Sequence, residues 1–198
     1  MLLLLADRGV LVSKKNKKNM LDKSNQRVGV FLDVANLYHS AKSLYNARVD
    51  FQELLSEAIG NRKLVRALGY TVSSGEEEEK EFFSALNKMG VEVRTKELQT
   101  FSSGKQKGNM DMEIAIEAMA MAPKLDVIIL GSGDGDFSVL VNYLKSMSCL
   151  VEVVAFGKST SSKLIEAADR FVDLDSDVPR FTRIRNRGIV SKVIRNRR

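Results

Sequence analysis

The stretch Val28-Gly29-Val30-Phe31-Leu32-Asp33 decides the fold expected of this chain. Its five uncharged residues are rich in apolar and β-branched side chains, and the run is the right length for a strand buried on both faces of a parallel sheet. A single carboxylate closes the run. Further short apolar runs occur at 127–130 and 151–156, so the sequence predicts several strands of the same kind.

Strand-like and helix-like stretches alternate along the chain, which predicts an α/β fold, a three-layer α/β/α sandwich with a mostly parallel sheet. The polar, Gly-containing stretch 100–108 is expected to be a loop. Met112, Ile116 and Met119 recur at helical spacing and predict a stripe that faces the core. The expected strands are 28–32, 64–72, 91–94, 127–130, 151–156 and 171–174, and the expected helices are 36–45, 51–59, 80–89, 110–121, 137–146 and 162–168.

The composition limits the classes of chemistry. The 198 residues are 44% hydrophobic, enough for one domain with a sizeable core. The single cysteine, Cys149, precedes an apolar run, so we expect it to be buried, and it excludes internal disulfides and paired-cysteine zinc sites. The lone His39 excludes a histidine cluster. The single cysteine predicts a reduced, cytoplasmic setting. Because no apolar run approaches the roughly 20 residues of a membrane helix, we expect no membrane partner.

The charge is unevenly distributed along the chain. Residues 1–27 carry a net charge of +5 and residues 180–198 a net charge of +8, so residues 28–179 carry −7 of the total of +6. We therefore expect three parts, a basic N-terminal arm (1–27), an acidic domain (28–179) and a basic C-terminal arm (180–198). Such arms suit a polyanionic partner, and the alternative is that they are solubilising tails.

Carboxylates follow two of the expected strands. Asp33 closes the first strand, and Gly131-Ser132-Gly133-Asp134-Gly135-Asp136 follows the fourth. In open parallel sheets ligands bind beyond the carboxyl ends of the strands, and these ends meet at one edge. Asp111, at the start of an expected helix, is placed to join them. Clustered carboxylates repel one another, and Mg²⁺ prefers carboxylate and water oxygens, so the pattern favours metal-assisted chemistry.

Each acid also has a simpler interpretation. Asp33 and Asp111 are both placed to cap helices, Asp134 and Asp136 to shape a turn, and Glu113 and Glu117 to form a solvated helix face. Other known motifs fail on spacing: the glycines do not fit a dinucleotide fingerprint or a P-loop, and position 145, where an EF-hand beginning at Asp134 needs glutamate, is lysine.

Three stretches together resemble a known family. They are Val30-Phe31-Leu32-Asp33-Val34-Ala35-Asn36-Leu37-Tyr38, Lys107-Gly108-Asn109-Met110-Asp111 and Ser132-Gly133-Asp134-Gly135-Asp136-Phe137. Their order and spacing are similar to those of NYN domains, in the LabA/DUF88 branch of the PIN-like nuclease superfamily. The resemblance covers about 28–174 and neither arm.

The resemblance implies a PIN-like Rossmannoid fold, Mg²⁺ or Mn²⁺ as cofactor, endoribonuclease activity and a possible homodimer. By motif position, the metal-site acids are Asp33, Asp111, Asp134 and Asp136, with Asn36 as the polar partner of the first. We expect RNA as the partner. The candidate RNA-binding residues are Lys105 and Lys107 in the loop and Arg183, Arg185 and Arg187 in the C-terminal arm, the alternative for the lysines being exposed loop charges.

Three functions stay open at this point. One or two divalent ions held by the acids would supply what phosphodiester hydrolysis needs without histidine, which favours a ribonuclease. The alternatives are a non-catalytic RNA- or nucleotide-binding regulatory module on the same fold, and a phosphatase for small phosphate esters.

Overall fold

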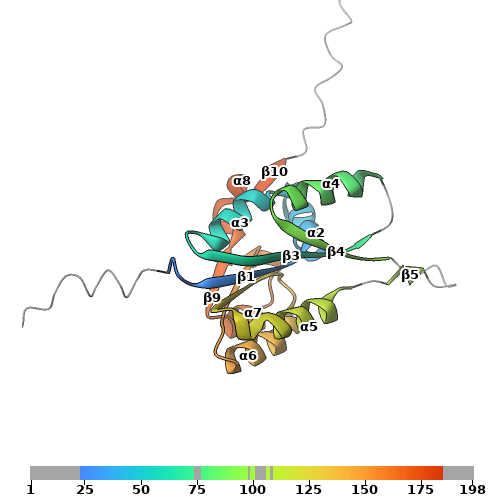
Figure 1. The fold of residues 1–198 in the computed structure, drawn as a ribbon. Helices are drawn as coiled ribbons and strands as arrows, with labels where there is room; N and C mark the ends of the chain where they lie inside the picture. The colour runs from blue at the N-terminus through green and yellow to red at the C-terminus, as the bar shows by residue number, and fades with distance from the viewer. Residues whose placement is uncertain (1–22, 74–76, 98, 101–105, 108, 185–198) are drawn as a thin grey trace, which may run out of the picture.

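The computed structural model describes residues 23–73, 77–97, 99–100, 106–107 and 109–184, and its centre is a six-stranded parallel sheet (Figure 1). The strand order is β4-β3-β1-β7-β8-β9. The strands are β1 (Arg27–Asp33), β3 (Lys63–Ser73), β4 (Val91–Glu97), β7 (Val127–Gly131), β8 (Leu150–Ala155) and β9 (Arg170–Asp173).

The order of the strands reverses between β1 and β7. From β1 the chain builds outward through β3 and β4 on one side, then returns to β7 and builds through β8 and β9 on the other. Leu32 pairs with Gly131 across this point. The carboxyl ends of β1 and β7 therefore form the topological switch point at which open α/β sheets bind their ligands.

Helices cover both faces of the sheet, which confirms the predicted α/β/α sandwich. In Figure 1, α2, α3, α4 and α8 lie on one side of the sheet, and α5, α6 and α7 lie on the other. The helices are α2 (Val34–Tyr45), α3 (Phe51–Ile59), α4 (Glu77–Lys88), α5 (Asp111–Met121), α6 (Ser138–Ser146), α7 (Ser162–Ala167) and α8 (Val178–Phe181). None of these described helices combines the length and apolar character needed to cross a membrane.

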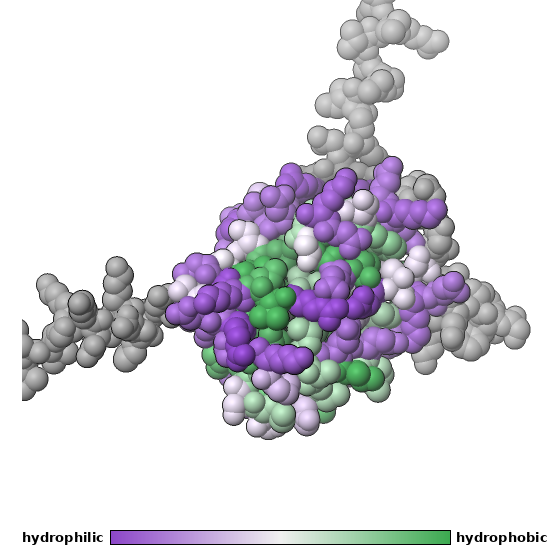
Figure 2. Space-filling model, in the orientation of Figure 1, coloured by the Kyte–Doolittle hydropathy of each residue, from purple (hydrophilic) through white to green (hydrophobic). Residues whose placement is uncertain are grey.

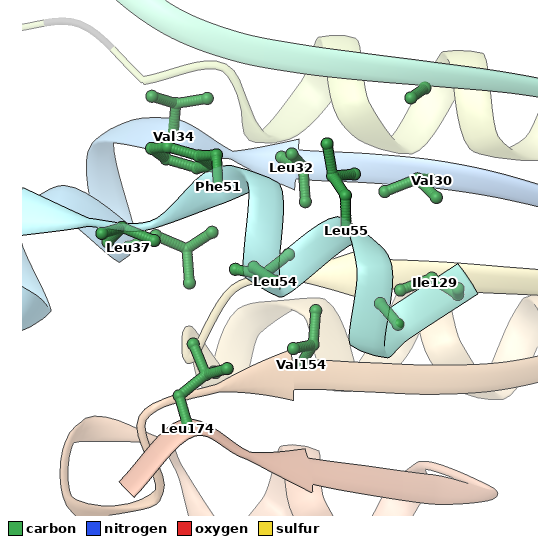
Figure 3. Close-up of a cluster of buried hydrophobic side chains, with 14 of the residues drawn as sticks. Val30, Leu32, Val34, Leu37, Phe51, Leu54, Leu55, Ile129, Val154 and Leu174 are labelled. Atoms are coloured by element: carbon green, nitrogen blue, oxygen red, sulfur yellow. The ribbon is translucent and has the colours of Figure 1, made fainter. Parts of the chain in front are cut away.

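Alternate residues of β1 enter two separate cores. Val30 and Leu32 pack with Leu54 and Leu55 of α3 in one core (Figure 3). Phe31 belongs to the core on the opposite face, because successive side chains of a strand point to opposite sides. Burial on both faces explains why β1 reads as a continuous apolar run rather than as an alternating one. Cys149 is also buried, as predicted.

The predicted core stripe of α5 is wrong. Ile114 and Ala118 are the residues that enter the core, whereas Met112 and Ile116 are 67% and 55% exposed, and Met119 is only partly buried against the core. Spacing determines which residues share a helix face, but it does not determine which face meets the sheet. The apolar residues on two sides of this helix made the assignment ambiguous.

The stretch expected to be a loop contains a short strand pair. β5 (Gln99–Thr100) and β6 (Gln106–Lys107) are antiparallel, with Gln99 opposite Lys107. Polar composition and glycine predicted a loop for 100–108. The same composition is compatible with short paired strands, so it could not exclude the two-residue strands β5 and β6.

The beginning of the expected C-terminal arm packs on the domain. The expected boundary at residue 180 falls inside α8, Phe181 is buried, and β10 (Thr182–Ile184) pairs with β2 (Ala47–Val49). Residues 1–22 and 185–198 lie outside the described residues, so the basic arms stay predictions there.

Candidate functional site

Asp33 lies where β1 ends and α2 begins, and it does cap the helix. One carboxylate oxygen, Oδ1, accepts the backbone N–H of Asn36 at 3.0 Å, and Oδ2 accepts the hydroxyl of Ser132 at 3.2 Å. Burial nevertheless raises the pKa of Asp33 above its ordinary value, and the charges of Asp111 and Asp134 raise it further against these two hydrogen bonds. The capping role is therefore real, but this carboxylate also sits among like charges.

Ser132 joins the two strand ends through one buried hydroxyl. Its Oγ donates to Asp33 and accepts the backbone N–H of Asp134 at 3.2 Å, and the residue is fully buried. The sequence motif contained Ser132 but did not reveal this role. The available signal was the small serine between Gly131 and Gly133, because such a run of small residues indicates that the chain passes close to a neighbouring segment, here the end of β1.

Asn36 makes a second connection between the same segments. Its side-chain Oδ1 accepts the backbone N–H of Gly133 at 3.0 Å, and the carbonyl of Gly133 in turn accepts the N–H of Ser161 at 3.0 Å. A Cβ atom on Gly133 would lie 3.0 Å from the Ser159 carbonyl oxygen. This close approach accounts for glycine at position 133.

Asp134 and Asp136 lie together in the loop after β7. Asp134 Oδ1 accepts the backbone N–H of Asp136 at 3.0 Å, which caps the 3₁₀ turn Gly135–Phe137. The side chain of Asp136 is exposed, and that of Asp134 is half-buried. Asp134 therefore caps the turn, as its simpler interpretation predicted, whereas Asp136 takes part in it through its backbone N–H. Both residues follow the carboxyl end of β7.

Asp111 brings a third segment to the same region. It is the first residue of α5, and the cap position is Met110, which makes no side-chain capping bond, so the interpretation of Asp111 as a helix cap is wrong. Asn109 Nδ2 donates to its Oδ2 at 2.7 Å. Burial and the charges of Asp134 and Asp136 raise the pKa of Asp111.

The four acids thus form one negatively charged region at the switch point. Among the ion pairs between described residues, none joins a Lys or Arg to Asp33, Asp111, Asp134 or Asp136. In the same part of the chain, no three His, Cys, Asp or Glu side chains are grouped closely enough to hold a metal ion as they stand. The charges of neighbouring acids nevertheless act on Asp33 and Asp111, so these carboxylates are electrostatically coupled.

Glu113 and Glu117 are not simply a solvated face of α5. Glu113 pairs with Lys96 at 2.9 Å, and Glu117 accepts the hydroxyl of the buried Tyr70 at 2.6 Å. Burial and then this bond raise the pKa of the Tyr70 hydroxyl.

The predicted RNA-binding residues are only partly described. Arg183 pairs with Asp50 at 2.5 Å, at the start of α3, and its side chain is 72% exposed. Lys107 is described in its backbone alone, in β6. Lys105, Arg185 and Arg187 lie outside the described residues.

Comparison with known proteins supports the resemblance. Residues 27–175 match the family model of the NYN domain. The "Low amplitude and bright protein LabA" of Synechococcus elongatus is 30% identical over 158 residues, which are 75% of this chain and 84% of that protein. The crystal structure of a protein of unknown function from Vibrio parahaemolyticus is 30% identical, with a TM-score of 0.74, and the match covers 83% of this chain and all of the other.

Proposed function

Because the chain belongs to the NYN domain family, within the PIN-like nuclease superfamily, we propose that it is a metal-dependent endoribonuclease that hydrolyses RNA phosphodiester bonds. One observation carries the proposal: at the switch point of the sheet, burial and the charges of acids from neighbouring segments raise the pKa values of Asp33 and Asp111. A cluster that costs folding energy in this way suits a site that receives a cation.

The donor chemistry fits Mg²⁺ or Mn²⁺. Carboxylate oxygens are the ligands that these hard ions prefer, and we assign them to Asp33, Asp111, Asp134 and Asp136. When bound, such an ion supplies a Lewis acid that neutralises phosphate charge and activates water.

The remaining residues of the site position these acids. Ser132 and Asn36 tie the loop after β7 to the end of β1, so that Asp33 and Asp134 keep a defined separation. Asn109 orients Asp111. Lys105, Lys107, Arg183, Arg185 and Arg187 are proposed to contact RNA phosphates, since positive charge offsets the repulsion between the acidic domain and the RNA backbone. The homodimer and the cytoplasmic location stay predictions.

A second function is favoured by one specific observation. Because no three described acids are grouped for a metal, a module that binds RNA or a nucleotide without cutting it is the alternative on the same fold.

Cleavage assays with the purified full chain separate the two functions. Labelled single-stranded and structured RNAs are incubated with Mg²⁺, Mn²⁺ or EDTA. We expect cleavage that depends on the metal and that falls at least about 100-fold in Asp134→Asn, as happens when catalytic groups are removed. The melting temperature should stay unchanged or rise slightly, because one of several repelling charges is removed.

Asp126→Asn is the matched control. Asp126 lies next to the opposite end of the same strand, β7, where it pairs with Arg27 at 2.8 Å, so the same chemical change there should leave cleavage intact. Full activity of Asp134→Asn would contradict the catalytic assignment. RNA binding without cleavage under any metal would favour the binding module.

A further inference from the structure

A groove of about 400 Å³ lies between the edge strand β4 and helix α5. Its walls include Tyr70, Arg94, Lys96, Met110, Ile116 and Glu117. In Figure 1, β4 lies above α5, and Figure 2 shows mostly hydrophilic side chains over this region, with apolar side chains among them. A groove of this size accommodates a small ligand or part of a larger one.

The groove is continuous with the acidic region. Tyr70 on β3 is paired in register with Asp33 on β1. Met110 immediately precedes Asp111 along the chain. Two walls of the groove are therefore direct neighbours of two of the proposed metal-site acids.

Among the described residues that line this groove, Arg94 is the cation whose N–H donors make no close hydrogen bond. Its nitrogens lie 3.6 Å from Glu92 Oε2 and 3.7 Å from Glu117 Oε2, beyond hydrogen-bond distance. Both carboxylates bind other groups more closely: Glu92 accepts two bonds from Arg66 at 2.7 and 2.6 Å, and Glu117 accepts the Tyr70 hydroxyl at 2.6 Å. The fork-shaped guanidinium of Arg94 is thus held in place, with donors left for a phosphate.

The same groove offers an apolar contact beside this cation. Ile116 is 55% exposed although it is a large aliphatic residue, and Met110 forms a buried part of the wall. Lys96 is engaged by Glu113 at 2.9 Å. One available cation next to an exposed apolar side chain matches a nucleotide, which has an anionic phosphate and an apolar base face.

We propose that this groove binds the nucleotide that adjoins the scissile phosphate of a single-stranded RNA. Arg94 contacts a phosphate oxygen, and Ile116 contacts the base or ribose. The inference rests on the proposed function, because it places the cut at the four acids, but the groove itself is tested by binding alone.

The test measures binding of a fluorescent single-stranded RNA of about twelve nucleotides by anisotropy, with Mg²⁺ present and salt varied. The full chain carries Asp134→Asn, so that cleavage does not interfere. Arg94→Gln should weaken binding about tenfold and lower the slope of log affinity against log salt by about 0.7, the value for one phosphate contact on a single strand. Ile116→Ser should weaken binding about fivefold without changing that slope.

Arg170→Gln is the matched control. Arg170 is also a half-exposed arginine that pairs with a glutamate, Glu152, at 3.4 Å, but it starts the edge strand on the other side of the sheet. It should leave both affinity and slope unchanged, and melting temperatures confirm that all variants are folded. If the Arg94 and Ile116 variants had the same affinities and salt slopes as the control, the proposal that the groove binds a nucleotide would be overturned. This holds whether or not the wild type cuts RNA. If the wild type cuts no RNA while the two signatures appear, the proposed hydrolysis fails and the nucleotide site stands. Absence of RNA binding overturns both.

Discussion

At the scale of single residues, Asp33 meets two opposing demands on its charge. As a helix cap it accepts the N–H of Asn36, which favours the ionised form. Burial and the neighbouring acids favour the protonated form, and these effects raise its pKa. An asparagine would retain the capping oxygen without the charge, so the substitution Asp33→Asn separates the two demands.

We predict that Asp33→Asn is at least as stable as the wild type at pH 7 in EDTA. Since the folded pKa of Asp33 lies above the unfolded one, the folded chain binds more protons between these two values. The free energy of unfolding therefore falls as the pH rises through this window, and the destabilisation persists above it. The amide is neutral throughout, so its advantage should shrink as the pH is lowered through the window. Urea unfolding of both proteins at pH 7 and near pH 3.5 measures this. If Asp33→Asn were less stable than the wild type by the same amount at both pH values, the carboxylate of Asp33 would act as a helix cap alone.

At the scale of elements, the site depends on how the end of β1 and the loop after β7 are tied together. Asn36 lies in the first turn of α2, and its side chain accepts the N–H of Gly133, a buried residue. A buried N–H without a partner costs free energy. The bond from Gly133 to Asn36 therefore stabilises the contact between the loop after β7 and the end of β1.

We predict that Asn36→Ala lowers the free energy of unfolding by about 1–3 kcal/mol, the cost of a buried donor left without its acceptor. Asn142→Ala, on the exposed side of α6, is the matched control and should change stability by less than about 0.5 kcal/mol. Urea unfolding checks both variants. If the two asparagines proved equivalent, the side chain of Asn36 would not hold the loop.

The same elements show how far the sequence predicts the fold and the site. Buried parallel strands such as β1 are recognisable because burial on both faces leaves a continuous apolar run. The acids at their ends could be predicted to converge because parallel strands share one carboxyl edge. The side of α5 that faces the core could not be predicted, because Ile114 and Ile116 are equally apolar and only packing distinguishes them. The role of Ser132 was also out of reach, since it depends on an interaction between segments about a hundred residues apart.

At the scale of the whole molecule, the proposed binding of RNA to an acidic domain requires positive charge elsewhere in the chain. Residues 180–184, which the charge pattern assigned to the arm, pack on the domain. Arg180 pairs with Glu53 at 3.0 Å and with Glu57 at 2.9 Å, and Phe181 is 3% exposed. Removing the chain from residue 180 onward would therefore expose the core, and any decrease in RNA binding could then be attributed to unfolding.

Truncation after Ile184 tests the arm without disturbing this packing. It keeps β10 on β2 and removes residues 185–198, which contain no acidic residue and the basic residues Arg185, Arg187, Lys192, Arg195, Arg197 and Arg198. We predict that the truncated chain melts at the temperature of the full chain and binds single-stranded RNA more weakly. The salt slope should fall by about 0.7 for each RNA phosphate that the arm neutralises in the full chain. The rate of cleavage at saturating RNA should stay the same, because all four acids belong to the part that remains. Anisotropy titrations at several salt concentrations measure the slope. An unchanged slope would contradict a phosphate-binding role, since a solubilising tail releases no counterions from the RNA.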